Sequence, residues 1–104
     1  MSAKRIVLAS PVEGQIIGTT VVVSGRCDTY EGNVQLRVRD SRGRVLARGY
    51  GTGGTLGRMG AFDTTLTLEN SPTTETGMVE AFEVDMKDGS ERETVTVNIR
   101  FREG

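Results

Sequence analysis

The chain contains no histidine, no tryptophan and a single cysteine, Cys27. Histidine is the side chain that most often moves protons near neutral pH and most often binds metals, so its absence removes both roles and every Ser–His or Cys–His pair. One cysteine forms no internal disulfide, and it excludes zinc sites built from clusters of cysteine and histidine. We therefore expect no enzyme: no catalytic residues, no cofactor and no metal centre.

Long hydrophobic runs and a large excess of one charge are also missing. No stretch approaches the roughly 20 apolar residues of a membrane helix, and the formal net charge is -1. A nucleic-acid partner would favour a strongly basic face, so we expect neither nucleic-acid binding nor membrane insertion. The apolar run Ile6–Ala9 is too short for a signal peptide, which leaves a cytoplasmic protein or a domain excised from a longer exported chain.

The composition favours strands over helices. Valine, isoleucine and threonine total 29 residues, whereas the helix formers alanine and leucine total 11. Fourteen glycines divide the 104 residues into short segments, and no segment of a dozen residues repeats its apolar positions every 3.6 residues. We expect one all-β domain over residues 1–104, with its core at about residues 5–102.

Seven segments carry alternation or are bounded by turn residues, and each predicts a strand. They are 5–9 (with a short continuation at 15–17), 20–27, 33–39, 44–50, 62–69, 78–87 and 93–102. Five glycines between Gly51 and Gly60 predict the longest flexible loop. Seven strands at about ten-residue spacing predict an antiparallel β-sandwich of immunoglobulin or fibronectin-III-like order. In it, the first, second and fifth strands face the fourth, third, sixth and seventh.

Alternation also predicts which side chains face the core. Cys27 alternates with core valines, so we expect a buried and inert thiol. In the sixth strand we expect Phe82, Val84 and Met86 to be buried. Its acidic residues would then lie on the outer face between two arginine pairs, in the order Arg37 and Arg39, Glu83 and Asp85, Arg100 and Arg102. Such alternation of sign across strands predicts a ladder of salt bridges on a solvated face.

Several short motifs occur in an order that is typical of one family. They are Ser10–Gly14, Val23–Gly25, Tyr30–Val34, Val38–Asp40 with Gly43, Thr52–Gly54 followed by Phe62, and Phe82–Val84 with Asp88–Ser90. Over roughly Arg5 to Phe101 the chain resembles the immunoglobulin-like domain of bacterial spore germination. The resemblance implies an extracytoplasmic β-sandwich module of a cell-envelope or spore-associated protein, often joined to other domains. It supplies no catalytic residue or cofactor to carry over.

In the predicted order, the loops after the even-numbered strands gather at one end of the domain. These are residues 28–32, 51–61 and 88–92, and loop clusters on rigid scaffolds commonly serve recognition. We expect partner-binding residues there: Tyr30, Glu31, Leu56, Arg58, Met59 and Asp88. Two alternatives remain open, because Tyr30 would equally close the end of the sandwich, and Leu56 and Met59 would equally fold back onto the core.

A weak calcium site is a further possibility at the same end. The oxygen ligands would come from Asp28, Glu31, Asp88 and Glu91. The Asp-x-Asp-x-Asp-Gly spacing of calcium loops is absent, and Asp-Gly is ordinary turn chemistry. The sequence therefore favours no metal.

These observations predict a non-catalytic module that binds or positions a protein or cell-wall partner. Its contacts would come from the loop end or from an edge strand at 44–50 that joins a neighbour's sheet. Two other functions stay open: a carboxylate-based hydrolase of cell-wall carbohydrate, and a purely structural spacer. The sequence specifies neither the ligand nor the oligomeric state.

Overall fold

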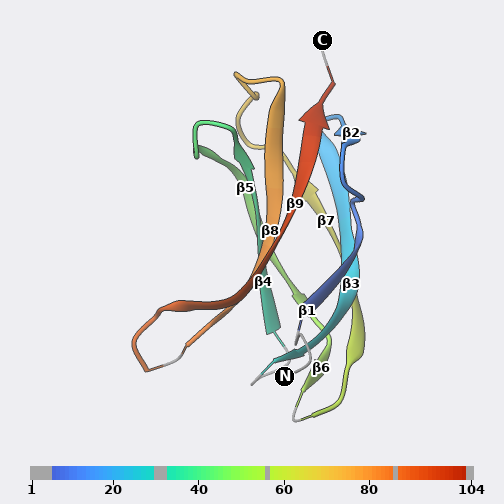
Figure 1. The fold of residues 1–104 in the computed structure, drawn as a ribbon, viewed down its shortest axis with the longest axis vertical. Helices are drawn as coiled ribbons and strands as arrows, with labels where there is room; N and C mark the ends of the chain where they lie inside the picture. Colours follow the sequence, from blue (N-terminus) through green and yellow to red (C-terminus); the bar gives the residue numbers. More distant parts are fainter. Residues whose placement is uncertain (1–5, 30–32, 56, 86, 103–104) are drawn as a thin grey trace.

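The computed structural model describes residues 6–29, 33–55, 57–85 and 87–102, and these form strands and loops with no helix (Figure 1). Nine strands occur in this part of the chain. They are β1 (Ile6–Ser10), β2 (Gln15–Ile17), β3 (Thr20–Thr29), β4 (Asn33–Asp40), β5 (Val45–Thr52), β6 (Gly54–Thr55), β7 (Gly60–Thr67), β8 (Thr76–Val84) and β9 (Glu91–Phe101). The prediction of an all-β chain is confirmed.

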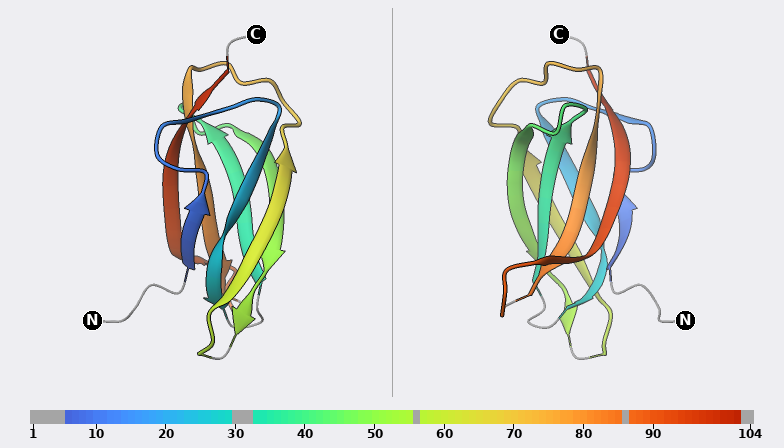
Figure 2. Two further views of the ribbon diagram at one scale, coloured as in Figure 1. Left: turned by 90° about the vertical axis from the view of Figure 1, so that its right-hand side faces the viewer. Right: turned by 60° about the vertical axis from the view of Figure 1, so that its left-hand side comes forward.

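The strands form two sheets that lie face to face (Figure 2). In the first, β3 pairs with β1 and β7, and its last two residues pair with β6. The second has the order β2-β9-β8-β4-β5. The neighbours predicted for the longer strands are therefore the observed ones.

Two short strands change the predicted count of seven and the all-antiparallel pairing. β2 was expected to continue the first strand, but it lies parallel to β9 in the opposite sheet. β6 forms within residues 51–60, where a flexible loop was expected, and it pairs parallel to Asp28 and Thr29. β2 has three residues and β6 has two. Segments this short show no periodicity that distinguishes a strand from a loop, so these strands are defined only by their pairing with distant segments.

The core lies between the two sheets and draws on both. Val23 and Cys27 of β3 face Leu36 of β4 and Val79 of β8, and all four are at most 2% exposed. The predicted burial of Cys27 is confirmed. Because the side chains of a strand alternate between its two faces, each strand gives its apolar residues to this one interior.

Strand β5 approaches β7 closely although the two belong to different sheets. A Cβ on Gly51 would meet the ring of Phe62 at 3.0 Å and the Thr64 hydroxyl at 3.1 Å, so glycine permits the approach. The Thr64 hydroxyl donates to the Tyr50 carbonyl (3.0 Å), and Glu69 N–H donates to the Leu46 carbonyl (2.8 Å). Two carbonyls on the edge of β5 are thus engaged, which weakens the prediction that residues 44–50 add to a neighbour's sheet.

The hairpin of β8 and β9 bends away from the body of the molecule, and we call its outer part, residues 83–93, the arm (Figure 1). Ala81 pairs with Val95, but Glu83 pairs with Arg92, so two β9 residues lie opposite Phe82. Glu93 is one of them and has φ = 56°. This is a β-bulge, which increases twist and bends the strands that carry it. It also reverses which face of the sheet the β9 residues before it occupy.

Candidate functional site

The outer face of the five-stranded sheet carries a polar cluster that differs from the predicted one. Residues directly opposite across antiparallel strands share a face, and Arg37 lies opposite Glu80 while Gln35 lies opposite Phe82. Phe82 is therefore on the outer face, where the Arg37 guanidinium lies 4.4 Å from its ring centroid.

The core positions of β8 are Val79 and Ala81, both 0% exposed. Phe82 is 8% exposed, so its predicted burial is confirmed, but it is buried against Arg37 on the outer face and is not part of the core cluster. The prediction that Val84 is buried is wrong, because Val84 is 36% exposed. Met86 lies outside the described residues. Both sets of alternating positions in residues 78–86 contain apolar side chains, so periodicity alone did not choose the correct one.

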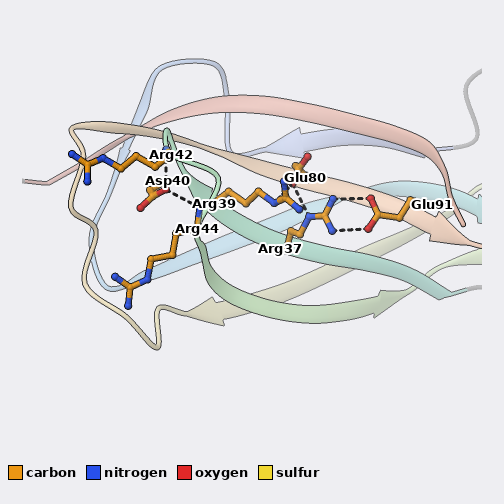
Figure 3. A network of polar contacts seen from close by, with 7 residues as sticks. All are labelled: Arg37, Arg39, Asp40, Arg42, Arg44, Glu80 and Glu91. Atoms are coloured by element: carbon orange, nitrogen blue, oxygen red, sulfur yellow. Dashed lines mark hydrogen bonds and ion pairs between the residues drawn. The ribbon is translucent and has the colours of Figure 1, made fainter. Parts of the chain in front are cut away.

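Arg37 is the centre of this cluster (Figure 3). Its Nε donates to Glu80 Oε1 (2.6 Å), and its two terminal nitrogens donate to Glu91 Oε2 and Oε1 (2.7 Å each). The Arg37 side chain is 10% exposed and that of Glu91 is 43% exposed. Glu91 reaches this face because the bulge reverses the alternation of β9, so the cluster ties the arm to β4.

The charges of the cluster shift each other's pKa. Hydrogen bonds from Arg37 lower the pKa of Glu91 below its ordinary range, against a smaller opposing effect of burial. The same hydrogen bonds to Glu91 raise the pKa of Arg37 further above neutrality. Both groups therefore keep their charges across the physiological pH range.

The predicted salt-bridge ladder is right for Arg37 and Arg39 but wrong in its acids, and within the described ranges Arg100 and Arg102 make no ion pair. Glu80 Oε1 lies 3.1 Å from Nε of Arg39 as well as accepting from Arg37. Asp85 pairs instead with Arg92 within the arm, at 2.9 Å. Glu83 is 8% exposed and follows the core residue Ala81 on the same face. The β-bulge in β9 brings Glu91 to the outer face, and nothing in the local sequence identifies that bulge.

Asp40 is the second polar group that the sequence did not single out. It is 0% exposed, and its Oδ1 accepts hydrogen bonds from the N–H groups of Arg42 and Arg44 (2.9 Å each). Its Oδ2 accepts a long bond from the Thr73 hydroxyl (3.4 Å). Asp40 thereby closes the turn between β4 and β5, with Gly43 at φ = 88°, and its role is structural.

The predicted loop end is described only in part. Tyr30, Glu31 and Leu56 lie outside the described residues. Arg58 is exposed, and Met59 is 37% exposed. Their loop is anchored at Gly57, because Asp28 Oδ1 accepts a hydrogen bond from Gly57 N–H (2.9 Å). Met59 is not part of the buried core cluster, and its role in binding a partner stays a prediction.

Asp88 lies apart from that loop, near the tip of the arm. The arm and loop 53–59 project from the same end of the molecule in different directions (Figures 1 and 2). Asp88 accepts a hydrogen bond from Ser90 N–H (2.9 Å), and hydrogen bonding to Ser90 lowers the pKa of its carboxyl group. The structure thus does not join Asp88 to Arg58 and Met59.

Glu31 lies outside the described residues, and two of the other acidic residues weighed as calcium ligands are engaged elsewhere. Asp28 binds the Gly57 amide, and Glu91 binds Arg37. In the part of the chain that the structure describes, no three acidic or cysteine side chains form a group suited to a metal ion. Burial raises the pKa of the Cys27 thiol, so it stays protonated and a poor nucleophile.

Two grooves lie at the opposite end of the domain and were not predicted. One, of about 430 Å³, is formed by the turn before β3, the loop between β7 and β8, and the end of β9. Its lining residues are Thr19, Ser71, Pro72, Thr73, Thr74, Glu75, Phe101 and Arg102. The other, of about 300 Å³, shares most of them and adds Ile17, Gly18 and Leu68. Each groove is formed by segments that are distant in sequence. No local sequence motif therefore predicts either groove.

No helix in the described ranges has the length and apolarity needed to cross a membrane.

The sequence of this chain matches a family model. Curated proteins yield no match. The family model for the immunoglobulin-like domain of bacterial spore germination matches residues 5–90, more than half of the chain. Its β-rich, two-sheet architecture agrees with the strands described above, and the chain belongs to the family of immunoglobulin-like domains of bacterial spore germination.

Proposed function

We propose that this protein is a non-catalytic module that binds and positions a partner in the bacterial cell envelope, as part of a spore-germination-associated protein. The family supports a non-catalytic module. The envelope location and the partner are our inference, as is the single-domain organisation over residues 1–104.

The observation that carries the proposal is the loop around Arg58 and Met59. Met59 is 37% exposed, and Arg58 is exposed. The hydrogen bond from Gly57 N–H to Asp28 anchors the loop directly before these two residues, which reduces the entropy that they lose on binding. A flexible thioether beside a guanidinium is a combination enriched at protein interfaces.

The grooves do not favour the hydrolase alternative. Glycoside hydrolysis commonly uses two carboxyl groups on opposite sides of the scissile bond. The groove of about 430 Å³ contains one, Glu75. Glu80 and Glu91, the two carboxylates on the outer face, are both neutralised by Arg37.

Site-specific photo-crosslinking in the full-length protein, in cells that produce it, tests the proposal. A crosslinking residue at position 59 should give a discrete adduct, and the pair Arg58→Ser and Met59→Ser should abolish partner capture with an unchanged melting temperature. The matched control is Arg26→Ser with Val22→Ser, because these are also an exposed arginine and an exposed apolar residue, on the outer face of β3.

Three outcomes would contradict the proposal. Absence of any adduct at position 59 would favour the spacer. Equal loss of capture in the control pair would show that the loop has no special role. Release of reducing sugar from cell-wall glycan, lost on changing an acidic residue to its amide, would favour the hydrolase.

A further inference from the structure

The groove of about 430 Å³ lies beside the end of β9. The loops and the strand end that form it are at the end of the domain opposite to loop 53–59 (Figure 2). The loop between β7 and β8 forms one wall. The turn before β3 and the end of β9 form the rest. This site is independent of the loop used in the proposed function.

Two oppositely charged residues line this groove and do not form an ion pair with each other. Glu75 and Arg102 are both exposed in it. Within the described ranges, neither side chain makes a hydrogen bond or an ion pair, so their charged atoms do not come within 4.0 Å of each other. Nearby opposite charges that remain separate are each available to a ligand.

Backbone hydrogen bonds hold the two residues at this separation. Phe101 N–H donates to the Glu75 carbonyl (2.8 Å), and Arg102 N–H donates to the Ile17 carbonyl (2.8 Å). The two charges are thus carried by paired backbone and not by free loop tips. Preorganisation of this kind reduces the entropy lost on binding.

The remaining lining suits a small and partly polar molecule. Thr19 and Ser71 contribute hydroxyl groups, and Pro72 and Phe101 contribute apolar surface. A volume of about 430 Å³ is near the lower end of the range for small-molecule sites. An arginine guanidinium suits a carboxylate, and a glutamate carboxylate suits an ammonium group.

We propose that this groove binds a small zwitterion of the class of α-amino acids and short peptides with free ends. The carboxylate of the ligand pairs with Arg102, its ammonium group pairs with Glu75, and its side chain lies against Pro72 and Phe101. Few contacts and an open groove give an expected Kd of ~1 mM.

Titration of the 15N-labelled protein with L-alanyl-L-alanine, followed by amide NMR shifts, tests this assignment. Shifts should cluster at Thr19, Ser71, Glu75 and Arg102. The C-terminal amide and the N-acetyl form of the dipeptide should each bind about tenfold more weakly, because each lacks one charge-assisted contact.

Protein variants test which charge of the groove contacts which end of the dipeptide. Arg102→Gln should weaken binding of the dipeptide about tenfold and leave binding of its C-terminal amide unchanged. Glu75→Gln should do the same for the dipeptide and its N-acetyl form. Arg100→Gln is the matched control, because Arg100 is an exposed arginine of the same strand outside this groove, and it should leave all affinities unchanged.

Four results would overturn the assignment. They are no saturable shifts with the dipeptide, shifts centred on Arg58 and Met59, equal binding of all three peptide forms, and shifts in the groove with N-acetylglucosamine but not with the dipeptide. Crosslinking at position 59 is unaffected by any of them, so failure here and failure of the proposed function are distinguishable.

Discussion

Arg37 and Glu91 are 54 residues apart in sequence, and both carboxylate oxygens of Glu91 accept hydrogen bonds from the Arg37 guanidinium at 2.7 Å. This is the contact that ties the arm to the body of the five-stranded sheet. It depends on the β-bulge at Glu93, because without the bulge Glu91 would face the core side.

Loss of this contact should destabilise the protein moderately. Glu91→Gln should lower the free energy of unfolding by about 1 kcal/mol, since the Glu91 side chain is 43% exposed and its ion pair is partly screened by solvent. Arg37→Gln should cost more, about 2–4 kcal/mol, because it removes both bonds to Glu91 and the shorter of the two ion pairs of buried Glu80. Urea denaturation of both variants and the double variant gives the coupling energy. Glu69→Gln, an exposed glutamate outside the cluster, should change nothing. A coupling energy near zero would contradict the role of the pair.

The stabilisation from Glu91 should depend on pH in one direction. Its folded-state pKa is lowered by Arg37, so in acid the unfolded chain binds more protons than the folded one. The contribution is complete above the ordinary range of a glutamate pKa and is lost as the pH falls through the folded-state value. The difference in stability between the native protein and Glu91→Gln should therefore shrink between about pH 6 and about pH 3. A difference that grows in this range would show that the pKa is raised instead.

Residue 93 should prefer glycine to a β-branched side chain. Glu93 has φ = 56°, a left-handed conformation that is costly for residues with a branched Cβ. Glu93→Gly should raise the stability by about 0.5 kcal/mol, and Glu93→Val should lower it by about 1–2 kcal/mol. Thermal unfolding of the two variants measures the gap. Equal melting temperatures would show that the bulge does not hold this backbone conformation in solution.

Gly25 should be intolerant of any side chain. A Cβ at this position would overlap the Val7 carbonyl oxygen and lie 3.0 Å from Leu8 Cα, both backbone atoms of β1. Gly25→Ala should therefore cost about 2–4 kcal/mol and expose the amides of β1 to hydrogen exchange. Gly18→Ala is the matched control, because its nearest neighbour is the flexible end of Arg102 at 3.9 Å, and it should stay within about 0.5 kcal/mol of the native protein. Similar losses in both would contradict a specific clash.

Much of the strand pattern follows from local alternation, which is why the long strands β3, β4 and β9 were predictable, although their short neighbours β6 and β2 were not. Val34, Leu36 and Val38 occur at every second position between polar residues, so only one face of β4 suits the core. The faces of β8 were not predictable in this way, because Val79 and Phe82 are both apolar and only packing decides between them.

The candidate sites depend still more on contacts between distant segments. Arg58 and Met59 were recognisable as loop residues, because glycines surround them, but the sequence left open whether Met59 packs on the core. The pairing of Arg37 with Glu91 depends on a one-residue bulge, and the groove at Glu75 and Arg102 depends on the packing of three separate segments. Neither leaves a local signal in the sequence.

β1 begins at Ile6, in the lower half of the view along the long axis, and β9 ends at Phe101 near the top (Figure 1), in a molecule of 43 × 26 × 25 Å. A mechanical pull applied at these two residues would run along the strands and across their hydrogen bonds, which lie perpendicular to the strand direction. The bonds between β1 and β3 would then be loaded in shear and have to rupture together. Tension at these points would therefore meet a resistance that unzipping the same strands from one end would not.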